Sequence, residues 1–398
     1  MQYSLDQIRS PFQRLRALLG TTPPGLPPID LTIGEPKHGM PAFAADIIAR
    51  EAAGFSRYPP IGGLAELRCA IAGWMGRRYP RVSGLIDPDR HILPLSGSRE
   101  GLFSLIFPAL ARKTVPHPAV LMPNPFYQAY LAAALGAHCE PVLLPAVADT
   151  GFLPDLDAIP RETLERTTAF YLATPANPQG AVASADYLTK AIALARAHDF
   201  MLVVDECYSE IYRGEPPAGI LETALATGGL SHALSLNSLS KRSNAPGLRS
   251  GFIAGDPDFL AAYLDFRNVA CPQIPLPIQH ASAALWADEA HVETSRELYR
   301  QKLAMAAQCL AAHQQTRLKL DVPQGGFFLW LDLEDFGGGE AATETIWKEC
   351  GVKILPGEYL AQQDGQGFNP GSPYARVALV ESLDATEQAL SRVARLLR

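Results

Sequence analysis

Short apolar runs alternate with longer amphipathic stretches between residues 88 and 255. A short apolar run bounded by turn residues is typical of a buried strand, and an amphipathic stretch is typical of a helix that covers a sheet. Their alternation predicts repeated strand–helix units around a mostly parallel sheet. The predicted strands span residues 92–95, 119–122, 168–173, 200–204, 233–236 and 252–254.

Polar clusters follow most of these predicted strands. They begin at Ser96, Asn124, Thr174, Asp205 and Asn237. In an open α/β sheet, ligands bind at the carboxyl ends of the strands. We therefore expect the five clusters to meet at one cleft.

The segments on either side of this block have other patterns. Residues 1–54 are rich in proline and glycine and predict an arm with little core of its own. Residues 275–312 have the pattern of a long amphipathic helix, and strands are predicted at 318–333 and 374–380 with helix between them. These elements predict a mixed second domain that packs beside the sheet.

Composition narrows the function classes. The 398 residues allow roughly two to three domains, and the hydrophobic fraction of 47% excludes intrinsic disorder. A formal net charge of −7 offers nucleic acid no general attraction. The chain starts without a secretory pattern and has no apolar window of membrane-spanning length, so we expect a soluble, cytoplasmic protein. Six widely spaced cysteines predict reduced thiols, with neither disulfides nor a metal site.

A lysine with unusual neighbours follows the predicted strand 233–236. Lys241 has Ser240 directly before it, Ser238 three residues before it and Arg249 eight residues after it. This pattern suits a lysine that forms an imine with an aldehyde cofactor while the serines and the arginine hold the cofactor's phosphate. A surface loop with a solvated lysine accounts for Lys241 alone equally well, so residues elsewhere must decide.

Asp205 ends a predicted strand that is apolar enough to be buried. A buried carboxylate needs a cationic partner, and a protonated pyridine nitrogen is one. The alternative is that Asp205 caps the following helix. Tyr208 and Asn177 are placed to reach a ring hydroxyl in the same cleft, although Asn177 before proline is by itself only a turn signal.

Two more clusters suit a phosphate and an aromatic ring. Residues 96–99 join a predicted strand to a predicted helix, and free N–H groups at a helix start attract phosphate. A simple capping turn is the alternative. Tyr127 follows the next strand and offers a flat face for stacking, with ordinary packing as its alternative.

Together these clusters resemble the pyridoxal 5′-phosphate (PLP) enzymes of fold type I, specifically the class I/II aminotransferases, over nearly the whole chain. The resemblance implies an α/β fold: a large domain on a mostly parallel seven-stranded sheet flanked by helices, and a smaller α+β domain. The expected division is 1–45 for the N-terminal arm and part of the small domain, 46–283 for the large PLP-binding domain and 284–398 for the small C-terminal domain.

The resemblance also assigns roles to the PLP-binding residues. Lys241 matches the Schiff-base lysine, Asp205 the partner of the pyridine nitrogen and Tyr127 the stacking aromatic residue. Asn177 and Tyr208 match the ligands of the ring hydroxyl, and Tyr208 joins Lys241 and Asp205 as a catalytic residue. The positions that match the phosphate site are Ser98, Arg99 (through its backbone N–H), Ser238, Ser240 and Arg249.

Other matches concern the partner subunit and the amino-acid and 2-oxo-acid substrates. Tyr58 resembles the tyrosine that these enzymes lend to the phosphate of the neighbouring subunit, which implies a homodimer with shared active sites. Arg376 matches the arginine that binds the α-carboxylate of an amino acid. Its guanidinium can donate two parallel hydrogen bonds to a carboxylate, which lysine cannot do. Gly34 matches the glycine whose backbone contacts the same group, and Asn177 is also expected near the substrate.

Within the family, four segments resemble those of bacterial N-succinyldiaminopimelate aminotransferases of lysine biosynthesis, namely residues 10–15, 34–38, 205–212 and 241–244. That resemblance implies amino transfer between N-succinyl-L,L-diaminopimelate and 2-oxoglutarate. Distal carboxylates need further cations, for which Lys37, His38 and the Arg99 side chain are candidates. The alternative is that Lys37 is solvated and His38 is an ordinary loop residue. The rival functions are an aspartate, aromatic or LL-diaminopimelate aminotransferase, a PLP-dependent C–S lyase and a non-catalytic ligand sensor.

Overall fold

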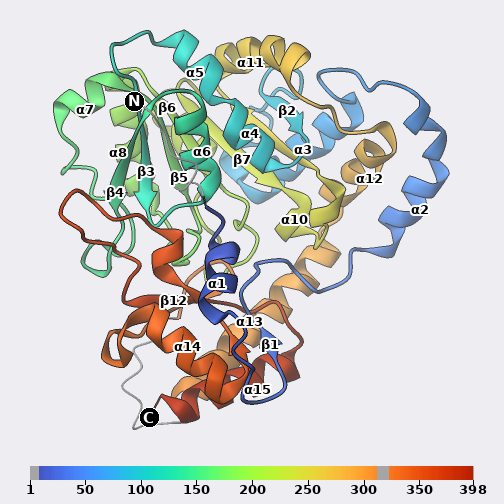
Figure 1. Cartoon of the computed structure of the whole chain (residues 1–398). Coiled ribbons are helices and arrows are strands. Elements are labelled where there is room, and N and C mark those ends of the chain that lie inside the picture. Colours follow the sequence, from blue (N-terminus) through green and yellow to red (C-terminus); the bar gives the residue numbers. More distant parts are fainter. Residues whose placement is uncertain (1–8, 312–321, 398) are drawn as a thin grey trace.

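The chain is built around one seven-stranded sheet, as seen in a computed structural model that describes residues 9–311 and 322–397 (Figure 1). The strand order is β2-β8-β7-β6-β5-β3-β4. Strands β7, β6, β5, β3 and β4 run parallel, and β8 pairs antiparallel with both β7 and β2. The strands are β2 (Ile92–Leu95), β3 (Ala119–Asn124), β4 (Glu140–Pro145), β5 (Thr167–Ala173), β6 (Met201–Asp205), β7 (Ala233–Ser238) and β8 (Gly251–Gly255). The predicted α/β fold with a mostly parallel sheet is confirmed.

The six strands predicted from apolar runs are all present, and their ends differ from the prediction by no more than two residues. The seventh strand, β4, had no predicted counterpart. It lies at the edge of the sheet, contains Pro141 and Pro145 and is only partly buried. An edge strand pairs on one side only, so it tolerates proline and needs no continuous apolar run.

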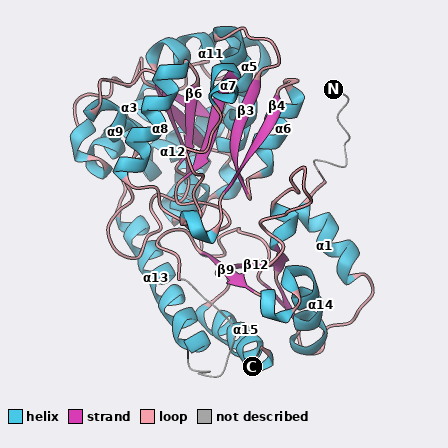
Figure 2. Ribbon diagram, turned by 90° about the vertical axis from the view of Figure 1, so that its left-hand side faces the viewer, coloured by secondary structure: helices cyan, strands magenta, loops and turns pink. Residues whose placement is uncertain are grey.

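Helices cover both faces of this sheet (Figure 2). Phe170 and Leu172 of β5 join one buried cluster, and Ala169 and Tyr171 join the other, as the two-residue period of a strand requires. The first face is covered by α2 (Ala42–Arg50), α3 (Ala65–Arg78), α7 (Arg161–Arg166), α8 (Ala185–His198), α9 (Ile220–Ala226), α10 (Leu239–Arg242) and α12 (Leu276–Ala287). The second face is covered by α4 (Ser98–Ser104), α5 (Ile106–Arg112), α6 (Gln128–Gly136) and α11 (Pro257–Ala270).

A smaller α+β region lies below this layer in both views (Figures 1 and 2). Its antiparallel sheet has the order β11-β12-β9, and β1 pairs in parallel with β10. The strands are β1 (Ile29–Asp30), β9 (Phe328–Asp332), β10 (Val352–Lys353), β11 (Leu355–Pro356) and β12 (Tyr374–Ala378). The helices are α1 (Pro11–Leu19), α13 (Ala290–Ala311), α14 (Gly338–Cys350) and α15 (Leu383–Leu396). No helix of the described residues is long and apolar enough to cross a membrane.

The prediction of one long helix over residues 275–312 is wrong in one respect, because the chain forms two helices there, α12 and α13. Asp288 is extended, and its carboxylate accepts a hydrogen bond from the His291 N–H at 3.1 Å, which caps a new helix start. Residues 312–321 lie outside the described part. In the described remainder of the strand predicted at 318–333, β9 is the only strand, and Gly325 forms an isolated β-bridge with Tyr212. The proposed domain boundaries stay predictions; residue 45 lies within α2 and residue 283 within α12.

Candidate active site

The carboxyl ends of the parallel strands border a cavity of about 260 Å³. Segments from both regions line it, including the N-terminal arm, the strand ends, β9 and β12. The cavity brings together twelve of the predicted site residues: Gly34, Ser98, Arg99, Tyr127, Asn177, Asp205, Tyr208, Ser238, Ser240, Lys241, Arg249 and Arg376. This convergence follows from the sheet topology, because parallel strands place their carboxyl ends at one edge.

Lys241 lies on α10, a short helix that starts directly after β7. The Ser238 hydroxyl caps this helix by accepting a hydrogen bond from the Ser240 N–H at 3.3 Å. The Lys241 ammonium donates to the Gly34 carbonyl. Burial lowers the pKa of Lys241 to about 8, so more of the amine is neutral and nucleophilic near neutral pH than for a solvated lysine.

Asp205 ends β6 and faces the cavity. Its carboxylate accepts hydrogen bonds at 3.1 Å from the Tyr130 hydroxyl and from the Cys207 N–H. No Lys, Arg or His nitrogen of the residues that the structure describes lies within 4.0 Å of it. Burial raises the pKa of Asp205, so the carboxylate is disfavoured until a cation reaches it. A protonated pyridine nitrogen fits this position chemically.

Arg376 on β12 is 4% exposed and lines the opposite part of the cavity wall. Its guanidinium donates to the Asn177 side-chain oxygen at 2.9 Å and to the Thr32 carbonyl at 2.7 Å. The buried Nε has no hydrogen-bond partner among the residues that the structure describes. Burial lowers the pKa of Arg376 to about 10. A buried guanidinium with an unsatisfied N–H and only neutral partners suits a carboxylate ligand.

The remaining cavity residues suit a phosphate. Gly97 has φ of +82°, and a Cβ built there would lie 2.1 Å from Arg249 Nη2, so the guanidinium packs directly on the glycine backbone. Arg249 Nη1 donates to the Pro246 carbonyl at 2.8 Å. The hydroxyls of Ser98, Ser238 and Ser240 border the same cavity. One guanidinium with several hydroxyls is a donor set that fits a phosphate dianion.

Aromatic side chains form other walls of the cavity. The Arg99 side chain donates to the Tyr127 hydroxyl, and the Tyr208 ring packs edge-on against Phe327 and Phe328. Sequence reasoning missed several lining residues, among them Phe12, Ile33, Gln128, Tyr130, Cys207 and Phe328. Tyr130 had a usable signal, because it follows Tyr127 by three residues at the start of a helix and therefore shares its face.

Three predicted residues lie outside the cavity. Tyr58 is fully exposed, and its predicted role belongs to the neighbouring subunit's site. Lys37 forms an ion pair with Glu381, and His38 Nε2 lies 3.0 Å from Lys302 Nζ. The roles of Tyr58 and Lys37 stay predictions.

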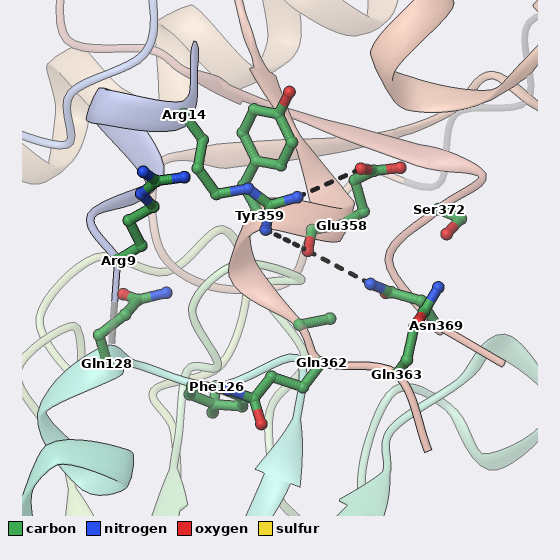
Figure 3. A pocket seen from close by; sticks show the side chains of 11 residues that line it. Arg9, Arg14, Phe126, Gln128, Glu358, Tyr359, Gln362, Gln363, Asn369 and Ser372 are labelled. Carbon is green, nitrogen blue, oxygen red and sulfur yellow. Dashed lines mark hydrogen bonds and ion pairs between the residues drawn. The ribbon is translucent and has the colours of Figure 1, made fainter. Parts of the chain in front are cut away.

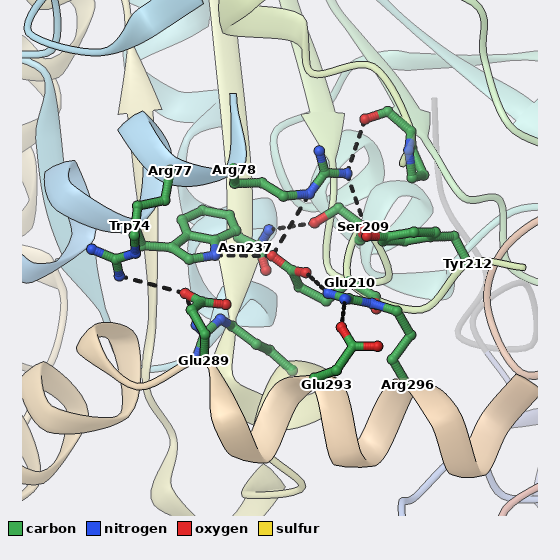
Figure 4. Close-up of polar contacts among 12 residues, drawn as sticks. Trp74, Arg77, Arg78, Ser209, Glu210, Tyr212, Asn237, Glu289, Glu293 and Arg296 are labelled. Carbon is green, nitrogen blue, oxygen red and sulfur yellow. Dashed lines mark hydrogen bonds and ion pairs between the residues drawn. The ribbon is translucent and has the colours of Figure 1, made fainter. Parts of the chain in front are cut away.

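A buried polar network supports the turn that follows Asp205 (Figure 4). Glu210 is 3% exposed and pairs with Arg296 at 2.6 Å and Arg78 at 3.7 Å, while Trp74 Nε1 donates to it at 2.9 Å. The Asn237 amide donates at 3.0 Å to the Glu206 carbonyl and to the Ser209 hydroxyl. The network therefore ties α3, β7 and α13 to the segment that carries the site.

Replacing Glu210 with alanine should lower the free energy of unfolding by about 3–5 kcal/mol, because two buried guanidinium groups lose their carboxylate. Urea denaturation measures this loss. Glu165→Ala is the matched control, since it removes an ion pair whose side chains are 86% and 56% exposed, and should cost at most about 0.5 kcal/mol. Equal losses in the two variants would contradict the structural role of Glu210.

Fold and cavity define a PLP-dependent aminotransferase of fold type I. The sequence model of the family Aminotransferase class I and II matches residues 27–379, and the chain belongs to this family, whose members depend on PLP. The buried carboxylate, the unsatisfied arginine and the lysine around one cavity fit that cofactor and an amino-acid substrate.

Individual relatives refine the comparison. The chain is 31% identical over 393 residues to an LL-diaminopimelate aminotransferase of Syntrophobacter fumaroxidans, covering 97% of this chain and 95% of that protein. An aminotransferase structure from Neisseria meningitidis has a TM-score of 0.91 and 37% identity, covering 98% of each chain. A probable N-succinyldiaminopimelate aminotransferase from Thermus thermophilus has a TM-score of 0.83 and 27% identity, covering 98% of this chain and 100% of that one.

Proposed function

We propose that the protein moves an amino group between N-succinyl-L,L-diaminopimelate and 2-oxoglutarate, using the cavity around Lys241. The observation that supports amino-acid chemistry most strongly is the buried Arg376, which lines the cavity and donates only to the neutral Asn177 side chain and the Thr32 carbonyl among the described residues. The succinylated donor is supported by four sequence segments, residues 10–15, 34–38, 205–212 and 241–244, and by the likeness to the Thermus thermophilus structure.

When bound, PLP supplies an electron-accepting ring that stabilises the charge left by removal of the Cα proton. Arg376 holds the α-carboxylate of the substrate and so orients its Cα towards Lys241. Lys241 Nζ would take the Cα proton as a base and give it back as an acid. Asp205 would hold the proton of the ring nitrogen, and Tyr208 and Asn177 would bind the ring hydroxyl.

Ser98, Ser238, Ser240 and Arg249, with the backbone N–H of Arg99, would hold the phosphate. Tyr127 would pack against the ring, and the backbone of Gly34 would contact the substrate carboxylate. The fully exposed Tyr58 supports a homodimer in which each subunit lends this residue to the other, because an exposed tyrosine is free to enter a neighbouring site. A cytoplasmic location is part of the same proposal.

A panel of amino donors tests the proposed reaction. The kcat/KM for N-succinyl-L,L-diaminopimelate should exceed that for LL-diaminopimelate by at least about tenfold, as expected where a site recognises a distal carboxylate. LL-diaminopimelate is the second candidate donor, because the Syntrophobacter relative is named an LL-diaminopimelate aminotransferase. A reversed preference would favour that candidate. Release of pyruvate and ammonia from cystathionine would instead indicate a C–S lyase.

Replacing Arg376 with lysine should lower kcat/KM for every α-amino acid donor by about 10–100-fold, because a charge-assisted two-pronged contact becomes a single one. Steady-state kinetics with glutamate measures the loss. PLP affinity, followed by spectral titration, should stay unchanged, which separates a substrate defect from misfolding. A tenfold loss of PLP affinity would count against the assignment of Arg376 to the carboxylate.

A further inference from the structure

Figure 3 shows the residues that line a second cavity, of about 410 Å³. Three chain segments line both cavities, residues 9–14, 126–128 and 358–363. Gln128 belongs to both walls. Since neighbouring residues of each segment line one cavity or the other, these segments form a wall that the two cavities share.

The second cavity is rich in hydrogen-bond donors. Figure 3 shows Arg9 and Gln128 on one side and Asn369 and Ser372 on the other. Arg14 lies between them, with its guanidinium 3.8 Å from the centre of the Tyr359 ring. This stacking fixes a planar cation in the cavity wall at a low entropic cost.

Two arginines and one carboxyl group, Glu358, line the second cavity. Arg14 pairs with Glu358 at 3.4 Å, whereas Arg9 has no hydrogen bond or ion pair with any residue that the structure describes. Burial and the neighbouring Glu340 raise the pKa of Glu358 to about 7, which disfavours its negative charge. With two arginines and one carboxyl group, the lining carries a net positive charge.

We propose that Arg9 and Arg14 form a subsite for the distal carboxylate of a long amino donor. The proposal rests on the proposed aminotransferase function: a long donor held by Arg376 through its α-carboxylate would extend its side chain past Gln128, which lines both cavities, into the second one. Unlike Lys37 and His38, these two cations line the cavity that shares Gln128 with the first one. The subsite recognises a terminal carboxylate and rejects a terminal methyl group of equal length.

The test compares 2-aminopimelate with 2-aminoheptanoate, two donors of equal length that end in a carboxylate and a methyl group. The measured quantity is the ratio of their kcat/KM values. Arg9→Gln should reduce this ratio at least about threefold, and the double variant with Arg14→Gln at least about tenfold. Arg16→Gln on the exposed face of α1 is the matched control and should leave the ratio within about twofold.

The single Arg9 variant guards against misfolding, because its side chain contacts no described partner that the fold would lose. An unchanged ratio in the double variant would overturn the subsite, even if kcat/KM fell equally for both donors. If the enzyme rejects N-succinyl-L,L-diaminopimelate while the ratio still depends on Arg9 and Arg14, the donor assignment fails and the subsite stands. If it accepts that donor and the ratio ignores both arginines, the subsite fails and the donor assignment stands.

Discussion

Replacing Lys241 with alanine is expected to abolish transamination, with kcat falling by at least about 10⁴-fold. The same amine is proposed to hold the cofactor and to move the Cα proton, so no other cavity residue can take over both tasks. The lowered pKa of about 8 favours the neutral form that each task needs. Stopped-flow absorbance of the PLP-loaded variant after addition of glutamate measures the half-reaction directly.

Lys302 provides an internal comparison for this prediction. Burial also lowers its pKa to about 8, yet its ammonium contacts His38 and the Leu379 carbonyl and does not line the cavity. Borohydride reduction of the PLP-loaded protein should therefore attach the cofactor covalently to Lys241. The peptide that contains Lys241 should gain the mass of the cofactor, and the peptide that contains Lys302 should not. A label on Lys302, or more than about 1% residual turnover in Lys241→Ala, would contradict the assignment.

The central sheet was predictable because its strands are buried on both faces. Residues 201–204 of β6 are all apolar, and such a run between turn residues is typical of a central strand in a parallel sheet. Strand β4 escaped prediction because its partial burial removes the need for an apolar run. Likewise, α12 and α13 share one amphipathic pattern, and only the hydrogen bond from His291 to Asp288 shows where the second helix begins.

The site was predictable in part for a similar reason. Residues at strand ends, such as Asp205 and Lys241, converge through topology alone. Arg376 differs, because its pattern is that of a charged strand edge, and its burial becomes visible only when β12 packs beside β9. The second cavity had no sequence signal, since Arg14, Gln128 and Glu358 come from segments more than 100 residues apart.

Replacing Asp205 with asparagine is expected to lower kcat by about 10²–10³-fold while PLP remains bound through the phosphate contacts. An opposite charge at contact distance shifts a pKa by about 1–3 units. Without the carboxylate, the ring nitrogen loses that much proton affinity, and the cofactor accepts electrons less well. Asparagine keeps the shape of the side chain, so its hydrogen bond from the Cys207 N–H is retained. Single-turnover kinetics with glutamate measures the effect.

Tyr130→Phe is the matched control for Asp205→Asn. It removes one neutral hydrogen bond, 3.1 Å long, to the same carboxylate and keeps the stacking of the ring on Tyr171. A neutral hydrogen bond contributes about 1 kcal/mol, so kcat should fall less than about tenfold. The large difference between the variants would assign the effect to the negative charge. If Asp205→Asn lost no more activity than Tyr130→Phe, then Asp205 would serve only to hold the turn after β6 through the Cys207 N–H, and the cofactor's ring nitrogen would need another partner.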